Sequence, residues 1–231
     1  MNTSKYPPAE ELADLLQREK SEGPTEDAAD EALPTRPAEL DNETCAWLGR
    51  RGIDARSIAH LSLHCLRKAG PPWASRWLET GHRLLLELYD EHGIVRSVKA
   101  LRVDDDWPLS LSPEGYTIDG LCLADHAGRR LLMGYPGTWG LVIVDEADFL
   151  ATCQAMQLVR DITPGAVDAV PAVIGVAGPG SWSLELGLAI PFTSVIACFA
   201  KDQDVINRST RHCGSANIDM MVDLHDLIFK T

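Results

Sequence analysis

The chain has 231 residues, enough for one or two domains, and its 45% hydrophobic and 24% charged residues are typical of a globular protein. Its longest apolar runs, residues 141–144 and 195–200, are far shorter than the roughly 20 residues of a membrane-spanning helix, and no signal-peptide pattern opens the chain. None of the six cysteines belongs to a C-x-x-C pair. We therefore expect a cytoplasmic protein with reduced thiols, no zinc and no membrane contact.

The formal net charge of −13 argues against simple electrostatic binding of nucleic acid, which needs clustered lysines and arginines. The first 40 residues, with ten acids and four bases, account for −6 of this charge. A metal-dependent enzyme that acts on nucleic acid stays compatible with the balance, because acidic metal ligands themselves lower the net charge.

Residues 1–40 are predicted to form an acidic, disordered tail, since prolines interrupt a stretch rich in Glu, Asp and Ala. The alternative for residues 9–20 is a short helix with Leu12, Leu15 and Leu16 on one face. Such a helix would bind a protein partner through these leucines.

Residues 41–135 are predicted to form a small α+β subdomain. Asp41 or Asn42 is suited to cap its first helix, and Asp54 is suited to cap a second. The predicted elements, in chain order, are helices over 43–50 and 54–63, strands over 83–89 and 94–103 that form a hairpin, and a further hairpin near 125–128.

From residue 136 to residue 231 the pattern changes to that of an α/β domain. Continuous apolar strands alternate with helices, which predicts a parallel sheet covered by helices on both faces. Ser181 or Ser183 caps the helix that follows the glycine turn 178–180. The predicted strands are 141–144, 169–176 and 194–200, and the predicted helices are 147–159, one after residue 183, one from 205, and 219–229.

Acidic side chains follow two of these strands. Asp145, Glu146 and Asp148 come after the first strand, and Asp202 and Asp204 come after the third. Ligands of an open parallel sheet bind at the carboxyl ends of its strands, so we expect these acids at one edge. Carboxylates there suit Mg²⁺, or Mn²⁺, held together with substrate phosphates. The alternative is that they cap helices, a role for which Asp148 and Asp204 are suited.

Basic residues offer phosphate contacts at two places. Lys99 and Arg102 belong to a predicted strand, and Lys201 directly precedes Asp202. The alternatives are a solvated strand face for the first two and an ion pair with a neighbouring acid for Lys201. The sequence contains no P-loop, no dinucleotide-binding glycine motif, no H-E-x-x-H and no nucleophile elbow.

Several short motifs occur along the chain in an order found in one known family. Residues 47–53 are similar to a YL-x-x-RGI opening, residues 86–95 to a PLYD-x-xG-x-V hairpin, residues 142–150 to a strand with E-G-x-x-D-x-L, residues 174–182 to a glycine-bearing middle, residues 195–204 to a strand ending in D-x-D, and residues 219–227 to a D-x-x-DLL helix. In this order, over residues 43–229, they resemble the Toprim-fold catalytic core of bacterial-type and phage or plasmid DNA primases.

The resemblance implies a Toprim-like α/β fold and Mg²⁺-dependent nucleotidyl transfer that makes primers on single-stranded DNA. The partners would then be single-stranded DNA and nucleotides. The residues it implies are Glu146, Asp202 and Asp204 for catalysis, the same three with Asp145 as metal ligands, and Lys99, Arg102 and Lys201 near nucleic-acid or nucleotide phosphate.

The first Toprim-like motif departs from the pattern of the family. An ungapped match of Asp148 to D-x-L puts Val144 where the family has its metal-site glutamate and Asp145 where it has glycine. Matching Glu146 and Ala147 to the Glu-Gly pair instead needs a shift and leaves Asp148 unmatched. Asp145 and Glu146 are therefore alternative ligands at this point.

Three functions stay open from the sequence. The first is a primase-like enzyme, and the second is a non-catalytic Toprim-like module that serves as a binding or accessory subunit of a mobile-element replication or defence system. The third is a Toprim nuclease that uses the same carboxylates to cut a phosphodiester. The positions of Asp145 and Glu146 relative to Asp202 separate the first from the second, because carboxylates within about 4–5 Å of one another can share a cation.

Overall fold

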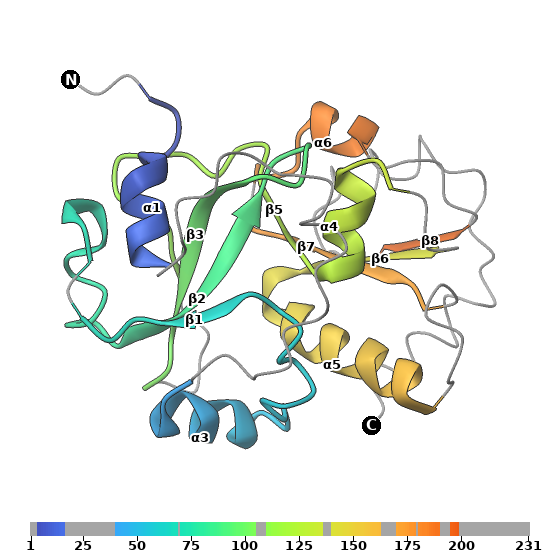
Figure 1. Cartoon of the computed structure of the whole chain (residues 1–231), viewed down its shortest axis with the longest axis horizontal. Helices are drawn as coiled ribbons and strands as arrows, with labels where there is room; N and C mark the ends of the chain where they lie inside the picture. The colour runs from blue at the N-terminus through green and yellow to red at the C-terminus, as the bar shows by residue number, and fades with distance from the viewer. Residues whose placement is uncertain are drawn as a thin grey trace. The chain divides into compact units, whose positions relative to one another are not determined.

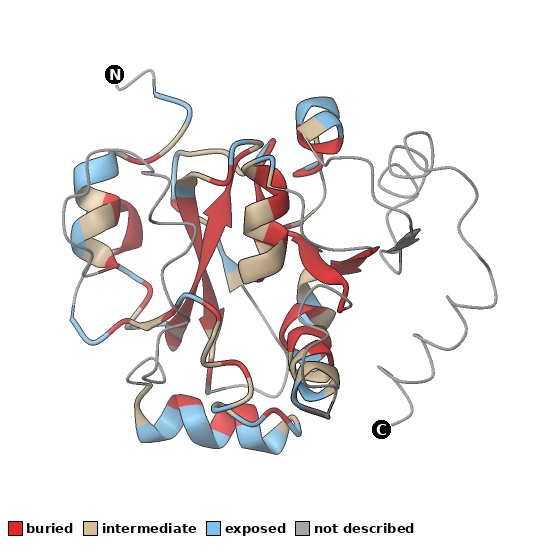
Figure 2. Cartoon of the chain, turned by 45° about the vertical axis from the view of Figure 1, so that its right-hand side comes forward, coloured by how far each residue is buried: buried red, intermediate tan, exposed pale blue. Residues whose placement is uncertain are grey.

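The computed structural model describes residues 4–16, 40–68, 70–104, 110–135, 140–162, 170–178, 180–189 and 195–198. The chain divides into two compact units, the first made of Met1–Tyr89 and Ile94–Ile118 and the second of Asp90–Gly93 and Asp119–Thr231. Within the described residues, no helix is long and apolar enough to cross a membrane. Strands in both units are mostly buried, whereas helices are buried on one side and exposed on the other (Figure 2).

An antiparallel sheet forms the centre of the first unit. Its strands, in spatial order, are β1 (Leu63–Cys65), β2 (His82–Tyr89), β3 (Val95–Arg102) and β4 (Ser110–Leu111). The first three are labelled in Figure 1. The two long strands β2 and β3 confirm the predicted hairpin. Leu85 pairs with Ala100 and Glu87 pairs with Val98, so these four side chains share one face of the sheet.

Helix α3 (Asn42–Arg50) begins where the sequence predicts. The Asp41 carboxylate caps it by accepting a hydrogen bond from the Thr44 amide at 2.8 Å. The second predicted helix, over 54–63, is wrong. Asp54 instead accepts hydrogen bonds from the Arg56 amide and the Ser57 hydroxyl, both at 3.2 Å, and closes local turns before β1 begins.

Helix α1 (Ala9–Leu15) packs its leucines into the core of the first unit. Leu12 and Leu16 are buried in a cluster that contains Trp73 and Trp77, the first of which belongs to the 3-10 helix η1 (Pro72–Ala74). The helix predicted as the alternative within 9–20 is therefore present, but its leucine face is covered by the chain itself. Residues 4–16 belong to the folded body rather than to a free tail, and residues 17–39 lie outside the described residues.

The sheet of the second unit combines parallel and antiparallel pairing. Strands β7 (Ala172–Val176) and β8 (Val195–Cys198) run parallel to β6 (Gly140–Asp145) on its two sides, and the short β5 (Cys122–Ala124) pairs antiparallel with β7. The helices are α4 (His126–Leu132), α5 (Glu146–Ile162) and α6 (Leu184–Ala189) (Figure 1). The predicted α/β class, with strands and helices in alternation, is confirmed, but the sheet is mixed rather than purely parallel. The helices predicted from 205 and over 219–229 lie outside the described residues.

The hairpin predicted near 125–128 is wrong, because these residues start helix α4. The buried Asp125 carboxylate accepts hydrogen bonds from the Gly128 amide at 2.7 Å and from the Val173 amide of the neighbouring strand at 3.0 Å. Its other oxygen accepts from Arg160 of α5 at 3.2 Å. One carboxylate thus caps α4 and joins it to β7 and α5.

Candidate functional site

The carboxyl end of β6 carries two acids in succession. Asp145 is the last residue of the strand and Glu146 is the first residue of α5, and both side chains are half-buried. Val144, which precedes them, is fully buried in the sheet. Since β6 lies between two strands that run parallel to it, the carboxyl ends of all three meet at one edge, where open sheets bind their ligands.

The neighbouring strands fix how far this edge extends. Asp145 lies opposite Val176, the last residue of β7, and Ile143 lies opposite Cys198, the last residue of β8. In the sequence, Lys201, Asp202 and Asp204 follow Cys198 within six positions. These three residues lie outside the described residues, so their meeting with Asp145 and Glu146 stays a prediction.

The acids at the start of α5 have two physical roles open to them. Glu146 and Asp148 lie in the first turn of a 17-residue helix, where a negative charge interacts favourably with the helix dipole. Their carboxylates, with that of Asp145, are also the hard oxygen donors that Mg²⁺ prefers. Among the described residues, no group of three or more His, Cys, Asp or Glu side chains is arranged to hold a metal ion. A complete site at this edge therefore needs donors from beyond Cys198.

The loop after β7 and the packing of α5 support this edge of the sheet. Gly178 and Gly180 both have positive φ, at 143° and 78°, which lets the chain turn sharply after the strand. Ser183 then caps α6 by accepting from the Leu186 amide at 3.1 Å, which confirms one of the two predicted caps. On β7, a Cβ added to Gly175 would lie 2.8 Å from the Phe149 ring, so glycine at this position allows α5 to pack closely against the sheet.

The predicted phosphate-binding bases differ in accessibility. Lys99 lies on β3 in the first unit and is only 6% exposed, which leaves little of it to reach a phosphate from solvent. Arg102, at the end of the same strand, is half-buried and forms an ion pair with Asp104. The hydrogen bond from Arg102 lowers the pKa of Asp104, which keeps this acid charged and the arginine paired. Of these two bases, Arg102 has the more accessible side chain.

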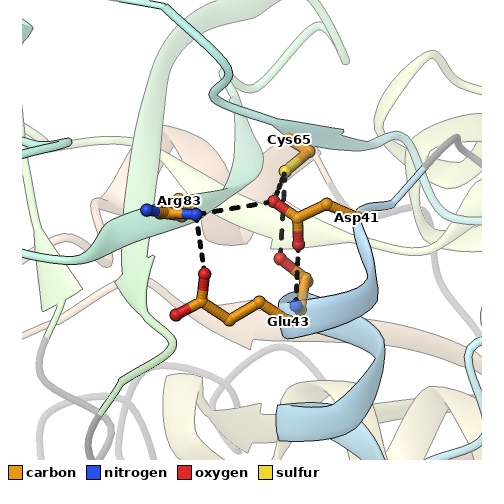
Figure 3. Close-up of polar contacts among 5 residues, drawn as sticks. Asp41, Glu43, Cys65 and Arg83 are labelled. Atoms are coloured by element: carbon orange, nitrogen blue, oxygen red, sulfur yellow. Dashed lines mark hydrogen bonds and ion pairs between the residues drawn. The ribbon is translucent and has the colours of Figure 1, made fainter.

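A polar cluster that the sequence did not reveal joins the start of α3 to β1 and β2 (Figure 3). Arg83 donates to Glu43 at 2.7 Å and lies 3.8 Å from the Asp41 carboxylate, which also accepts from the Cys65 thiol at 3.2 Å. Burial alone raises the pKa of Asp41, but the hydrogen bonds from Thr44 and Cys65 and the charge of Arg83 outweigh it and lower the pKa. Burial raises the pKa of Cys65, so the thiol stays protonated as a donor. The cluster therefore fastens α3 and is not a nucleophile site.

A second polar group lies inside β2. The Glu87 side chain is 1% exposed, and it contacts the His64 ring nitrogen at 2.8 Å and accepts from the Tyr89 hydroxyl at 2.7 Å. Both partners keep this carboxylate satisfied in an otherwise apolar strand. The sequence signal for it is a lone glutamate among leucines at 84–88, but the partner His64 is 23 positions away and only the sheet brings it close.

Comparison with known proteins gives structural similarity alone. No protein-family model and no curated protein matches the chain. A structure of the DnaG catalytic core has a TM-score of 0.48 and 13% sequence identity, and the match covers 87% of this chain and 66% of that one. A DnaG primase catalytic domain bound to ssDNA has a TM-score of 0.46 and 14% identity, and the match covers 82% of this chain and 62% of that one. The RNA polymerase domain of Mycobacterium tuberculosis primase DnaG in complex with double-stranded DNA has a TM-score of 0.46 and 13% identity, and the match covers 96% of this chain and 80% of that one. The chain thus spans less than two thirds of the first two, and at so low an identity the similarity concerns the fold and not the activity.

Proposed function

We propose that the protein is a primase-like enzyme that joins nucleotides into primers on single-stranded DNA with Mg²⁺. The observation that carries the proposal is the pair Asp145 and Glu146 at the carboxyl end of β6, between two parallel strands. One of these strands, β8, leads along the sequence to Asp202-Gln203-Asp204. The order of the sequence motifs supports the same assignment.

In this proposal, Glu146 or Asp145 from β6 and Asp202 with Asp204 from beyond β8 hold the metal. The ion would clamp a phosphoryl centre and stabilise the charge that develops there, and Mn²⁺ would serve in its place. The donor set fits such an ion, because it consists of carboxylates and contains no sulfur. Arg102 and Lys201 would contact phosphates, whereas the burial of Lys99 assigns it at most a supporting role.

The test is primer synthesis from labelled ribonucleotides on single-stranded DNA in the presence of Mg²⁺. We expect the double variant Asp202→Ala with Asp204→Ala, and separately Glu146→Gln, to lower the rate about 10²–10³-fold, as other losses of an electrostatic contact do. The matched control is Asp161→Asn, which changes an exposed acid at the far end of the same helix α5. No product from the unmodified chain, or equal product from the double variant, refutes the proposal.

A non-catalytic Toprim-like module is the second candidate, and Val144 favours it. This residue stands where the primase motif has its glutamate, and it is fully buried in the sheet. Titration of the full chain with Mg²⁺ in a calorimeter separates the two functions. Binding that is lost in the Asp202→Ala, Asp204→Ala variant supports the enzyme, and the absence of binding supports the module. Nicking of plasmid or single-stranded DNA with Mg²⁺ or Mn²⁺ would instead identify a nuclease.

A further inference from the structure

Strands β2 and β3 lie side by side in the first unit (Figure 1), and His82 at the start of β2 pairs with Arg102 at the end of β3. The register shifts between His82 and Leu84, as at a β-bulge. Beyond the shift, the Val103 amide donates to the Gly81 carbonyl at 3.0 Å. We call Gly81, His82, Arg102 and Val103 the hairpin end, because the bulge separates them from the regular pairing of the two strands.

The His82 side chain is buried in the hairpin end, and one of its two ring nitrogens has no hydrogen bond. The residue is 5% exposed, and its Nδ1 lies 2.8 Å from the Thr80 hydroxyl. That hydroxyl donates its own proton to the carbonyls of Arg76 and Trp77, at 2.9 and 3.2 Å, so it accepts from a protonated Nδ1. Nε2 is then the bare acceptor of a neutral ring, and it is buried without a partner.

Arg102 and Asp104 are the charged groups among the described residues that act on this imidazole. Arg102 opposes its protonation and Asp104 favours it, and the two form an ion pair with each other. The Asp104 carboxylate lies against the turn before β2, since a Cβ added to Gly81 would lie 2.6 Å from the carboxyl carbon. Burial has the largest effect and lowers the pKa of His82 from its usual 6.5, so the ring is neutral at neutral pH.

Protonation of the ring conflicts with this environment. A proton on Nε2 would create a buried donor without an acceptor, on a cation beside the Arg102 guanidinium. The Asp104 carboxylate cannot serve both groups at once, because Arg102 already donates to it. Water satisfies the imidazolium only when the hairpin end opens, and in the open form the ring regains its usual affinity for a proton. Acid therefore favours the open form.

We propose that His82 is a pH switch of the hairpin end: protonation of its ring opens this end, while the regular pairing of β2 and β3 stays formed. Opening breaks the hydrogen bond from Val103 to Gly81 and separates Arg102 from β2. The Arg102 guanidinium then becomes more accessible in acid than at neutral pH. The switch does not depend on the proposed nucleotidyl transfer, because it involves the hairpin end alone.

The test is hydrogen–deuterium exchange on the unmodified full chain from about pH 7.5 to about pH 5.5. Each rate is expressed as a protection factor, which removes the intrinsic dependence of exchange on pH. We expect the protection factor of the Val103 amide to fall several-fold below pH 6.5, and by no more than about tenfold per pH unit, the limit for one proton. The protected amides of residues 84–88, on the other side of the bulge, should keep theirs.

Two results in the unmodified chain would overturn the proposal. A constant protection factor at Val103 would mean that the hairpin end does not open in acid. An equal fall at Val103 and in residues 84–88 would mean that the whole unit unfolds and that no local switch exists.

A substitution of His82 tests whether its ring is the group that titrates. His82→Gln keeps a hydrogen-bonding side chain beside Thr80 but does not titrate, so its protection factor at Val103 should be independent of pH. The matched control is His92→Gln, which changes an exposed histidine in the turn of the same hairpin and should behave as the unmodified chain does. A pH dependence at Val103 that persists in His82→Gln overturns the proposal.

Two charge substitutions should shift the opening in opposite directions, which a purely structural role of His82 does not explain. Arg102→Gln removes the cation that opposes protonation, so the opening should move to higher pH. Asp104→Asn removes the anion that favours protonation, so the opening should move to lower pH. The Asp104 side chain is 42% exposed, so this variant keeps the test available if His82→Gln does not fold. Shifts in one common direction, or no shift in either variant, overturn the proposal.

Discussion

Replacement of Asp125 tests whether one buried carboxylate holds three elements of the second unit together. Its Oδ1 accepts from the amides of Gly128 and Val173, at 2.7 and 3.0 Å, and its Oδ2 accepts from Arg160 at 3.2 Å. Asp125→Ala removes all three hydrogen bonds, whereas Asp125→Asn keeps a carbonyl oxygen for the two amides and removes the negative charge. The two variants therefore separate the capping of α4 from the ion pair with α5.

The expected magnitudes follow from the hydrogen bonds that each substitution removes. Loss of a helix cap costs about 0.5–2 kcal/mol, and the Val173 amide left unsatisfied in the sheet costs about 1–3 kcal/mol more. The Asp125 side chain is fully buried and that of Arg160 is 16% exposed, so breaking the pair also contributes, with some compensation from solvent around the guanidinium. We expect Asp125→Ala to lower the free energy of unfolding by about 3–5 kcal/mol, and Asp125→Asn by about half as much.

Urea denaturation followed by circular dichroism measures these free energies. Asp161→Asn, at the exposed end of α5, is the control and should change stability by less than about 0.5 kcal/mol. Arg160→Met should cost less in the Asp125→Asn background than alone, since the pair is already broken there. If the Asn and Ala variants are equally destabilised, the amide hydrogen bonds contribute nothing and the reasoning fails. A decrease below about 1 kcal/mol for Ala would refute it entirely.

Three further predictions concern packing, pH and helix capping. Gly175→Ala places a Cβ 2.8 Å from the Phe149 ring and should destabilise the chain by about 1–3 kcal/mol, and an unchanged urea midpoint would contradict the close packing of α5. Burial lowers the pKa of His82 from its usual 6.5, so the unfolded chain takes up a proton at a higher pH than the folded chain does. Stability should therefore be complete above pH 6.5 and fall as the pH drops below that value. His82→Gln should weaken this dependence, and an identical slope in both proteins would rule His82 out. Asp41→Ala removes the cap at Thr44 and should cost about 0.5–2 kcal/mol in the same assay, whereas stability equal to that of the unmodified chain would show that the cap contributes nothing.

The elements that local pattern specifies were predicted well from the sequence. The hairpin of β2 and β3, the cap of α3 at Asp41, and the apolar strands β6 and β7 all express periodicity or capping within a few neighbouring residues. The acids after β6 were predictable for the same reason, because their place at a strand end follows from the chain order alone. Whether Asp202 and Asp204 complete that site stays a prediction, since it depends on residues beyond Cys198.

The errors arose where a side chain has partners that are distant in sequence. Asp125-His126-Ala127-Gly128 has the composition of a turn, but the Val173 amide lies 48 positions away and makes the same aspartate a helix cap inside the core. Lys99 was predicted to contact phosphate because it is a base on a strand, but that strand is buried on both faces around it.

The sequence by itself determined the α/β class, the long strands β2, β3, β6 and β7 and the acids at the end of β6, because hydrophobic period and cap chemistry act over a few residues. The tertiary structure decided which polar groups became structural and where the N-terminal helix went. Glu11 and Trp73 are 62 positions apart, and no local pattern in either segment records that they meet. A seven-residue helix in an acidic, proline-rich segment is stable only through the surface it covers, and that surface exists only once the sheet has formed.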